Sequence, residues 1–201
     1  MLRCAITDGT ASGFVNTTQI DCLLNQVRRW AADGIDMIQL REKNLDAGAL
    51  FALAEAILRV LRDTNSSTKL LINGRADVAI AARAHGVQLT AAPDELTPEQ
   101  VRTLFSHAGR PAPVVGVSCH TIDEVRRAHA DAADYILFGP VFEKRVRGNV
   151  ASQGIGVELL REACDTARPV PVLALGGVTR TNASECLQAG AAGIAGIRLF
   201  A

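Results

Sequence analysis

Aromatic residues are scarce in this sequence, and neither sign of charge is in excess. One Trp, one Tyr and six Phe leave the core of a 201-residue chain to Ala, Val, Leu and Ile, which is typical of a parallel sheet covered by helices. The 21 basic residues balance the 21 acidic ones, so the chain has no basic field to attract nucleic acid or an anionic membrane. No apolar run reaches the length of a membrane span. We therefore expect no nucleic-acid and no membrane partner.

The cysteines are few, odd in number and never spaced as Cys-x-x-Cys. Disulfide frameworks and zinc sites both need pairs or clusters of cysteine, so this pattern predicts reduced thiols in a cytoplasmic protein. The five are Cys4, Cys22, Cys119, Cys164 and Cys186. The chain opens with a strand-like segment, Leu2–Ile6, and shows no signal-peptide pattern there.

Short apolar runs alternate with helical patterns, which predicts an α/β fold with a parallel sheet. The expected strands are Leu2–Ile6, Met37–Leu40, Lys69–Ile72, Val87–Leu89, Val114–Ser118, Tyr135–Phe138, Val172–Leu175 and Gly193–Ile197. The expected helices are Thr18–Ala32, Ala47–Asp63, Asp77–Ala84, Thr97–Phe105, Ile122–Ala130, Val157–Ala167 and Asn182–Ala189. Eight strands favour one closed TIM (β/α)8 barrel over residues 1–201, with function at the carboxyl ends of the strands. An open doubly wound sheet is the alternative, weakened by the lack of a Gly-x-Gly-x-x-Gly turn.

Two features of the barrel follow from its loops and its end. The sequence stops at Ala201, directly after the last expected strand, so we expect the eighth helix to be absent or truncated. A second copy would then cover that edge, which predicts a homodimer. The longest irregular stretch, Gly139–Gly156, follows the sixth strand, and a loop of that length in a compact barrel is typical of a lid or a binding loop.

Polar and basic residues alternate where the second expected strand ends. Successive side chains of a strand face opposite sides, so Gln39, Arg41 and Lys43 would share the inner face, while Ile38 and Leu40 would face the helices. The first set is placed to meet an anionic substrate at the mouth of a barrel. The alternative is a solvated loop edge.

Other strand ends carry further candidates. Asn73 follows the third strand and can hydrogen-bond a ligand oxygen, although Asn73-Gly74 is also an ordinary turn sequence. On the fifth strand, Ser118 and His120 share the inner face by parity. A histidine there is placed for proton transfer near neutral pH, the alternative being a surface or capping histidine.

Glycine-containing turns follow the last two strands, which is the usual phosphate site of this fold. Gly176 and Gly177 allow backbone N–H groups to approach an anion, and Gly196, Ile197 and Arg198 follow the eighth strand. Tight turn geometry alone is the alternative for the glycine pair. The long loop offers Lys144, Arg145 and Arg147, either as a basic lid over a phosphorylated ligand or as a solvated charge cluster.

Five motifs, in order and spacing, resemble the thiamine phosphate synthase/TenI superfamily. They are Gln39–Lys43, Ile72-Asn73, Gly116–His120, Asp134–Phe142 and Ala174–Val178. The resemblance spans nearly the whole chain and implies a TIM barrel of thiamine biosynthesis that binds a small phosphorylated thiazole.

The sequence departs from the synthase branch of that superfamily at three places. The resemblance implies an aspartate for Mg²⁺ after Asn73, where this chain has Gly74. A second metal-binding aspartate is expected after the fourth strand, and here Pro93 aligns with it unless Asp94 substitutes after a one-residue shift. A Thr-x-Thr-Lys motif is expected in the long loop, where Lys144–Arg147 stands instead.

These departures place the TenI branch, which includes thiazole tautomerases, first. Tautomerisation needs a general acid/base group and a phosphate-binding site but no metal cofactor. His120 would move the proton, with Arg41 and Lys43 on the carboxylate; Gln39, Asn73, Ser118 and Lys144 complete the expected substrate site, and Gly176, Gly177, Gly196, Ile197 and Arg198 the phosphate site. The alternative is a thiamine phosphate synthase, which joins hydroxymethylpyrimidine diphosphate to thiazole phosphate with Mg²⁺ held by Asp94. A second alternative is a non-catalytic phosphate-ligand binder.

Overall fold

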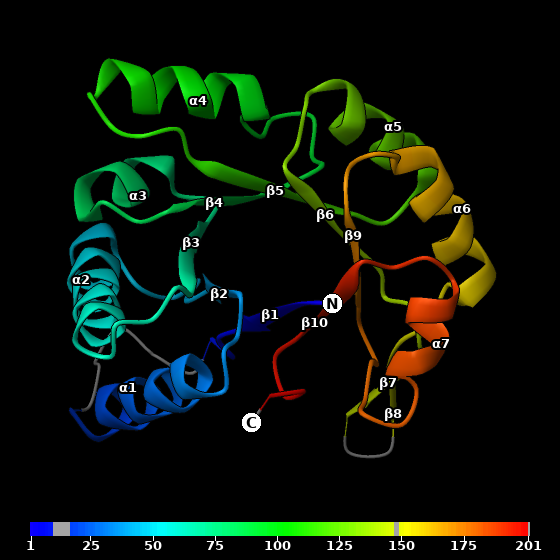
Figure 1. The fold of residues 1–201 in the computed structure, drawn as a ribbon, viewed down its shortest axis with the longest axis horizontal. Coiled ribbons are helices and arrows are strands. Elements are labelled where there is room, and N and C mark those ends of the chain that lie inside the picture. The colour runs from blue at the N-terminus through cyan, green and yellow to red at the C-terminus, as the bar shows by residue number, and fades with distance from the viewer. Residues whose placement is uncertain (10–16, 147–148, 201) are drawn as a thin grey trace.

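A closed barrel of eight parallel strands forms the centre of the molecule (Figure 1). The computed structural model describes residues 1–9, 17–146 and 149–200, and the side chains of these except 17, 144–146 and 149–152. The barrel strands are β1 (Leu2–Ile6), β2 (Met37–Leu40), β3 (Lys69–Asn73), β4 (Gly86–Thr90), β5 (Val114–Cys119), β6 (Tyr135–Phe138), β9 (Val172–Leu175) and β10 (Gly193–Gly196). They pair in chain order, and β10 closes onto β1. The TIM barrel prediction is confirmed, and the open-sheet alternative is wrong.

In the described parts of the chain, seven helices surround the barrel (Figure 1). They are α1 (Thr17–Ala32), α2 (Ala47–Asp63), α3 (Ala76–Ala82), α4 (Pro98–His107), α5 (Ile122–Ala130), α6 (Val157–Ala167) and α7 (Ala183–Gln188). None of these described helices has both the length and the apolar character needed to cross a bilayer.

The segment after β10 is held on α1. No helix follows β10 in the described chain, which runs to Phe200. The backbone carbonyl of Phe200 accepts hydrogen bonds from Gln26 Nε2 (3.1 Å) and from Trp30 Nε1 (2.8 Å). Trp30 is buried, so its N–H needs such an acceptor. The homodimer stays a prediction.

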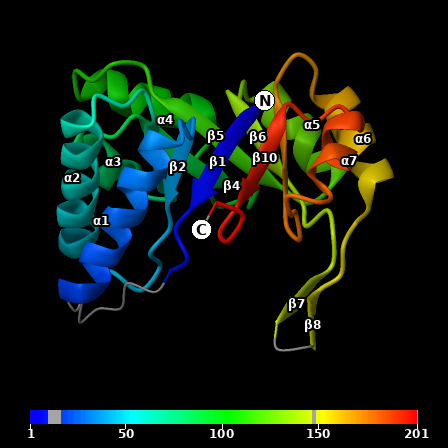
Figure 2. The ribbon, with the colours of Figure 1, turned by 60° about the horizontal axis from the view of Figure 1, so that its bottom comes forward.

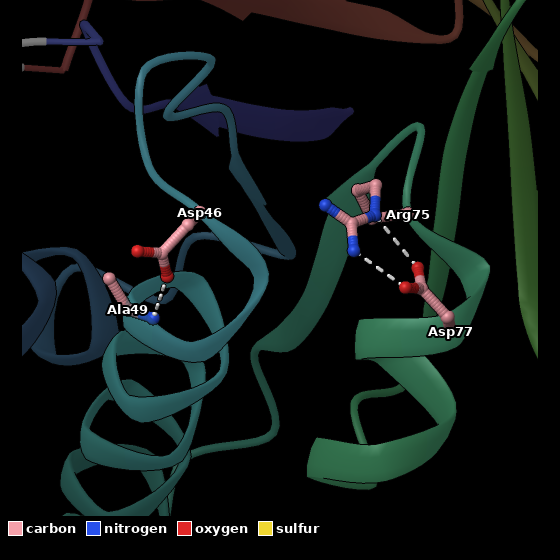
Figure 3. Close-up of polar contacts among 4 residues, drawn as sticks. All are labelled: Asp46, Ala49, Arg75 and Asp77. Carbon is pink, nitrogen blue, oxygen red and sulfur yellow. Dashed lines mark hydrogen bonds and ion pairs between the residues drawn. The ribbon is translucent and has the colours of Figure 1, made fainter. Parts of the chain in front are cut away.

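Local sequence signals set the ends of the helices. Asp46 caps α2 by accepting a hydrogen bond from the Ala49 N–H at 2.8 Å (Figure 3). Thr121 forms a capping box with Glu124 at the start of α5. Each cap satisfies helix N–H groups that have no partner within the helix. Because the caps set where the two helices begin, they also set how much chain is left to the loops at the strand ends.

The period of two along the strands divides the core into two clusters. Outward side chains pack against the helices in the larger cluster, which includes Ile38, Leu40 and Ile72. Inward side chains fill the barrel, and they are Cys4, Ile6, Met37, Leu71, Tyr135, Leu137, Leu173 and Ala195. Since the interior is closed by these side chains, only the ends of the barrel are open to a ligand.

The loop after β6 contains a hairpin that the sequence did not predict. Strands β7 (Lys144–Val146) and β8 (Asn149–Ser152) pair antiparallel within the expected irregular stretch. Figure 2 shows the hairpin projecting beyond the barrel on the side where β1 and β10 end. The side chains of Lys144 and Arg145, and all of Arg147, lie outside the described residues, so the basic lid stays a prediction.

His85 gives the stability of the fold a dependence on pH. Its Nδ1 accepts a hydrogen bond from the Leu70 N–H at 3.0 Å, which requires a ring without a proton on that nitrogen. Although the residue as a whole is exposed, partial desolvation of its ring, and then the positive charge of Lys69, lower the pKa of His85 below its ordinary value. The unfolded chain therefore binds the proton more readily than the folded chain does. The stabilisation is complete above the unfolded pKa of about 6.5 and is lost as pH falls through the lower folded pKa.

Replacing His85 with Gln should reduce this loss of stability at acid pH. Gln can accept the Leu70 N–H bond but does not titrate. We expect the difference in unfolding free energy between His85→Gln and wild type to shift in favour of the variant from pH 7 to pH 5, measured by urea unfolding. An unchanged dependence in His85→Gln would contradict the assignment.

Candidate active site

The mouth of the barrel begins with a buried amide pair on β2 and β3. Gln39 is 3% exposed, and its Nε2 donates a hydrogen bond to Asn73 Oδ1 at 2.8 Å. Within the described structure, the buried Gln39 Oε1 has no hydrogen-bond partner. A buried acceptor without a donor costs free energy, so a ligand N–H or O–H is the natural partner for this oxygen. The structure thus brings Gln39 and Asn73 together, and it leaves one of their oxygens for a ligand.

The chain leaves the strand pattern directly after β2. The predicted inner face for Gln39, Arg41 and Lys43 holds only for Gln39, because β2 ends at Leu40. Beyond it, Arg41 is half-buried and Lys43 is exposed, whereas Glu42 is 4% exposed and accepts a hydrogen bond from the Gly9 N–H at 3.3 Å. Sequence reasoning missed Glu42, since only the alternate residues Gln39, Arg41 and Lys43 were considered for the inner face.

Two cavities open at this end of the barrel, and both reach Glu42. The first has a volume of about 320 Å³ and is lined by Leu40, Glu42, Lys43, Leu45, Leu50, Asn73, Gly74 and Arg75. Arg75 is engaged by Asp77 in a two-bond fork (2.8 and 2.6 Å), which lowers the pKa of the Asp77 carboxyl (Figure 3). Lys43, rather than Arg75, is therefore left to meet an anionic ligand. The second cavity, about 310 Å³, extends toward α1 and is lined in part by Thr7, Asp8, Ile197 and Arg198.

A carboxylate stands over Gly74, but it belongs to Glu95. Its Oε2 is 3.9 Å from the position that a Cβ on residue 74 would occupy, and 3.4 Å from Thr90 Oγ1. Asp94 is exposed, and the described structure shows no hydrogen bond or ion pair of its side chain. The loop after β4 thus turns Glu95, and not Asp94, toward the mouth.

The donors near Gly74 fit magnesium better than zinc. In the described part of the chain, no three His, Cys, Asp or Glu side chains gather as a metal-binding group. Structural zinc needs four such ligands, whereas Mg²⁺ commonly binds through one or two carboxylates together with substrate phosphates and water. Glu95, with the Thr90 hydroxyl beside it, could supply the protein share of such a site.

Ser118 lies on the inner face of β5, as predicted, and is half-buried. Its Oγ accepts a hydrogen bond at 3.0 Å from Nε2 of Gln88, which is 1% exposed on β4. Sequence reasoning missed Gln88. The available signal was a polar side chain between Val87 and Leu89, on the inward parity of the strand.

His120 follows β5 and contacts the neighbouring strand end. Its Nδ1 lies in a short contact with the carbonyl oxygen of Gly139. Because a carbonyl only accepts, Nδ1 carries the proton, and the neutral ring presents Nε2 as a base. The backbone N–H of His120 donates a hydrogen bond to Glu124 Oε2 at 2.5 Å. The exposed ring is thus oriented for proton transfer, and its catalytic role stays a prediction.

Cys119, the neighbour of His120, is not a nucleophile. Burial, and then the negative charge of Glu124, raise the pKa of the Cys119 thiol to about 12, with Arg127 opposing. The thiolate is the reactive form of cysteine, so this residue is inert near neutral pH.

The turn after β9 requires its two glycines. Gly176 and Gly177 have φ angles of +88° and +66°. A Cβ on Gly176 would lie 2.5 Å from Pro140 Cα, and one on Gly177 would lie 2.7 Å from Phe142 Cβ. Close packing against the loop after β6 is therefore one reason for this glycine pair.

The same turn lies beside the segment that follows β10. Strands β9 and β10 are neighbours, with Leu175 paired to Ala195. Gly176 and Gly196 directly follow this pair on their two strands, while half-buried Ile197 and exposed Arg198 line the cavity that extends toward α1. A common phosphate site of Gly176, Gly177, Gly196, Ile197 and Arg198 stays a prediction.

Comparison with known proteins agrees with this architecture and assigns the family. Residues 11–200 match the TMP-TENI family model, described as thiamine monophosphate synthase. The thiamine-phosphate synthase of Chlorobium luteolum is 35% identical over 96% of this chain and 82% of its own length. That of Moorella thermoacetica is 36% identical over 85% of this chain and 77% of its own. The solved thiamine phosphate pyrophosphorylase of Pyrococcus furiosus superposes with a TM-score of 0.76 at 28% identity, covering 98% of this chain and 85% of that one.

These relatives carry the synthase name rather than a tautomerase name, so they favour the activity that the sequence had placed second. Neither the family model nor these names separate out a TenI branch for this chain. The chain belongs to the thiamine monophosphate synthase family, whose members act in thiamine biosynthesis.

Proposed function

We propose that this protein is a thiamine phosphate synthase, a transferase that joins hydroxymethylpyrimidine diphosphate to thiazole phosphate and releases diphosphate. One observation carries the proposal: the Glu95 carboxylate stands over Gly74, where the superfamily resemblance implies an aspartate. This chain has glycine directly after β3, where the resemblance implies the aspartate, and the loop after β4 brings Glu95 Oε2 to 3.9 Å from the position of a Cβ on residue 74. The names of the relatives at 35–36% identity support the same activity.

Glu95 would hold Mg²⁺ at this position, with the Thr90 hydroxyl beside it. When bound, the ion offsets the negative charge that builds up on the departing diphosphate. Lys43, exposed in the cavity next to Asn73 and Gly74, would meet the same diphosphate as a point charge. Half-buried Arg41 would add a second cation at the end of β2.

The remaining residues of the mouth would bind and orient the two substrates. Gln39 Oε1, buried and without a partner in the described structure, would accept a hydrogen bond from the pyrimidine. The turns after β9 and β10 would hold the phosphate of the thiazole through Gly177 and the Gly196–Arg198 segment. A bond from the thiazole nitrogen to the pyrimidine methylene carbon forms as the carbon–oxygen bond to diphosphate breaks. The barrel contributes by holding these atoms in line and by excluding water from the reacting carbon.

The direct test is formation of thiamine phosphate. Purified protein is mixed with hydroxymethylpyrimidine diphosphate, thiazole phosphate and Mg²⁺, and the product is oxidised to fluorescent thiochrome. We expect turnover that EDTA abolishes and added Mg²⁺ restores. No product, beside an active known synthase, would overturn the proposal. Binding of thiazole phosphate without turnover of any substrate would identify a non-catalytic binder.

Thiazole tautomerase is a second candidate, favoured by the geometry of His120. The Gly139 carbonyl fixes the proton on Nδ1 and leaves Nε2 as a base at the mouth. In this reaction Nε2 would take a proton from the thiazole phosphate carboxylate tautomer and return it at another ring position, giving the aromatic form without a metal.

Replacing His120 with Asn should lower tautomerisation by about a hundredfold or more, because acid/base catalysis contributes factors of that size. Isomerisation is followed by proton NMR, and binding by calorimetry, which should show little change. His129, exposed on α5, gives the matched control His129→Asn with the wild-type rate. An undiminished rate in His120→Asn, or no isomerisation by wild type, would exclude this candidate.

A further inference from the structure

Three polar side chains form a continuous chain through the interior of the barrel. Tyr135, the single tyrosine of the sequence, is buried on β6, and its hydroxyl donates a short hydrogen bond to Gln88 Oε1. Gln88 Nε2 in turn donates to Ser118 Oγ at 3.0 Å. The three residues come from neighbouring strands β6, β4 and β5, so the chain crosses β5. It starts in the closed interior and ends at the half-buried hydroxyl of the mouth.

The side chains of Tyr135 on β6 and Gln88 on β4 can meet across β5 because β5 carries a glycine, Gly116, between them. A Cβ on Gly116 would overlap the Tyr135 ring and Gln88 Oε1. The absent side chain thus leaves the space in which tyrosine and glutamine meet. Interiors of proteins are close-packed, so the tyrosine and the glutamine that occupy this space are held in a fixed arrangement.

The direction of the hydrogen bonds is fixed by the backbone. Gln88 Nε2 also donates to the carbonyl oxygen of Leu89 at 3.3 Å. A turned amide would place Oε1 against that carbonyl, and two acceptors repel each other. Burial keeps the pKa of Tyr135 well above its ordinary value, so the phenol retains the proton that it donates.

These directions determine what Ser118 offers to a ligand. Its Oγ already accepts the second N–H of Gln88, so its own O–H is left to point away from the amide, toward the mouth. Ser118 pairs in register with Thr90, whose hydroxyl lies 3.4 Å from Glu95 Oε2. The Ser118 hydroxyl therefore lies on the strand next to β4, whose last residue, Thr90, contacts the candidate magnesium carboxylate of Glu95.

We propose that Gln88 and Tyr135 are positioning residues that fix the Ser118 hydroxyl as a hydrogen-bond donor to an anionic oxygen of the bound ligand. Phosphate and diphosphate oxygens only accept, so they match this donor, whereas a ligand N–H does not. The assignment of that oxygen to the diphosphate rests on the proposed function. The positioning itself rests on the hydrogen bonds and on the space left by Gly116.

A double-mutant cycle tests the coupling. The background variant is Tyr135→Phe with Gln88→Met, which removes both partners at once and leaves no unpaired buried group. The probe is inorganic diphosphate with Mg²⁺, and the dissociation constant is measured by calorimetry. Ser118→Ala should weaken binding about tenfold in wild type, since a hydrogen bond to a charged group has that size, and less than about twofold in the background variant.

Equal effects of Ser118→Ala in both backgrounds would overturn the proposal, since a merely structural role of Gln88 and Tyr135 cannot couple to Ser118. Gln188→Met, on the exposed end of α7, is the control and should bind as wild type. If the background variant does not fold, Tyr135→Phe alone serves in the same cycle, where Ser118→Ala should again lose part of its effect. Failure of wild type to bind diphosphate would also overturn the proposal. The binding measurement needs no turnover, so it tests the positioning of Ser118 separately from synthase activity.

Discussion

Replacing Glu95 with Gln is expected to lower thiamine phosphate formation by about a hundredfold or more, on the scale at which loss of one electrostatic contact to the transition state acts. Gln has nearly the same size and can keep the contact with Thr90 Oγ1, at 3.4 Å in wild type. It lacks the negative charge that a hard cation such as Mg²⁺ prefers. The Mg²⁺ concentration needed for half-maximal rate should therefore rise together with the fall in turnover.

Asp94 supplies the matched control. It is adjacent in sequence, carries the same charge and is exposed, so Asp94→Asn removes a carboxylate that does not face Gly74. We expect this variant to keep the wild-type Mg²⁺ dependence. Binding of Mn²⁺ in place of Mg²⁺, followed by electron paramagnetic resonance, gives a readout that does not depend on turnover. Loss of Mn²⁺ binding in Asp94→Asn but not in Glu95→Gln would reverse the assignment. Retention of Mn²⁺ binding in both variants would mean that the position of Glu95 over Gly74 no longer supports the synthase proposal.

The strands and helices could be predicted closely because the sequence shows the strand period of about two residues and the helix period of about 3.6 residues. Apolar runs such as Tyr135–Phe138 are bounded by a polar residue or a glycine, here Asp134 and Gly139, and the predicted bounds of this strand equal the observed ones. Capping residues add exact starting points, as Asp46 does for α2. Parity also placed Ser118 on the inner face correctly. These signals are local, so the sequence carries them without knowledge of the packing.

Parts of the site depend on the path of the backbone outside strands and helices, which hydrophobic periodicity does not predict. Strand parity fails after Leu40, where the backbone leaves the sheet and buries Glu42 rather than Arg41. The choice between Asp94 and Glu95 depends on the turn of an irregular loop, in which neighbouring carboxylates look alike in sequence. The orphan oxygen of Gln39 appears only when the partner of its amide is known. Geometry across strands, not along them, therefore decides these roles.

Replacing Gly116 with Ala should destabilise the protein by about 3 kcal/mol or more, because overpacking a rigid interior has costs of this order. The new Cβ would lie 2.5 Å from Tyr135 Cε1 and would also overlap Gln88 Oε1. Neither neighbour can move freely, since Tyr135 and Gln88 are both buried and bonded to each other. For a domain of this size, a loss of this order lowers the melting temperature by about 6–12 °C. Differential scanning calorimetry measures both quantities.

Gly48 provides the opposite expectation for the same substitution. It lies in the first turn of α2, and its added Cβ would meet nothing closer than Asp46 Oδ1 at 3.5 Å, which is ordinary contact. Gly48→Ala should therefore stabilise the protein by about 0.5–1 kcal/mol through helix propensity. Adding Tyr135→Phe to Gly116→Ala should restore little, since the ring carbon and Gln88 Oε1 remain in place. A melting temperature for Gly116→Ala at or above that of wild type would show that the polar chain does not fill the space beside β5, and the positioning of Ser118 would lose its structural basis.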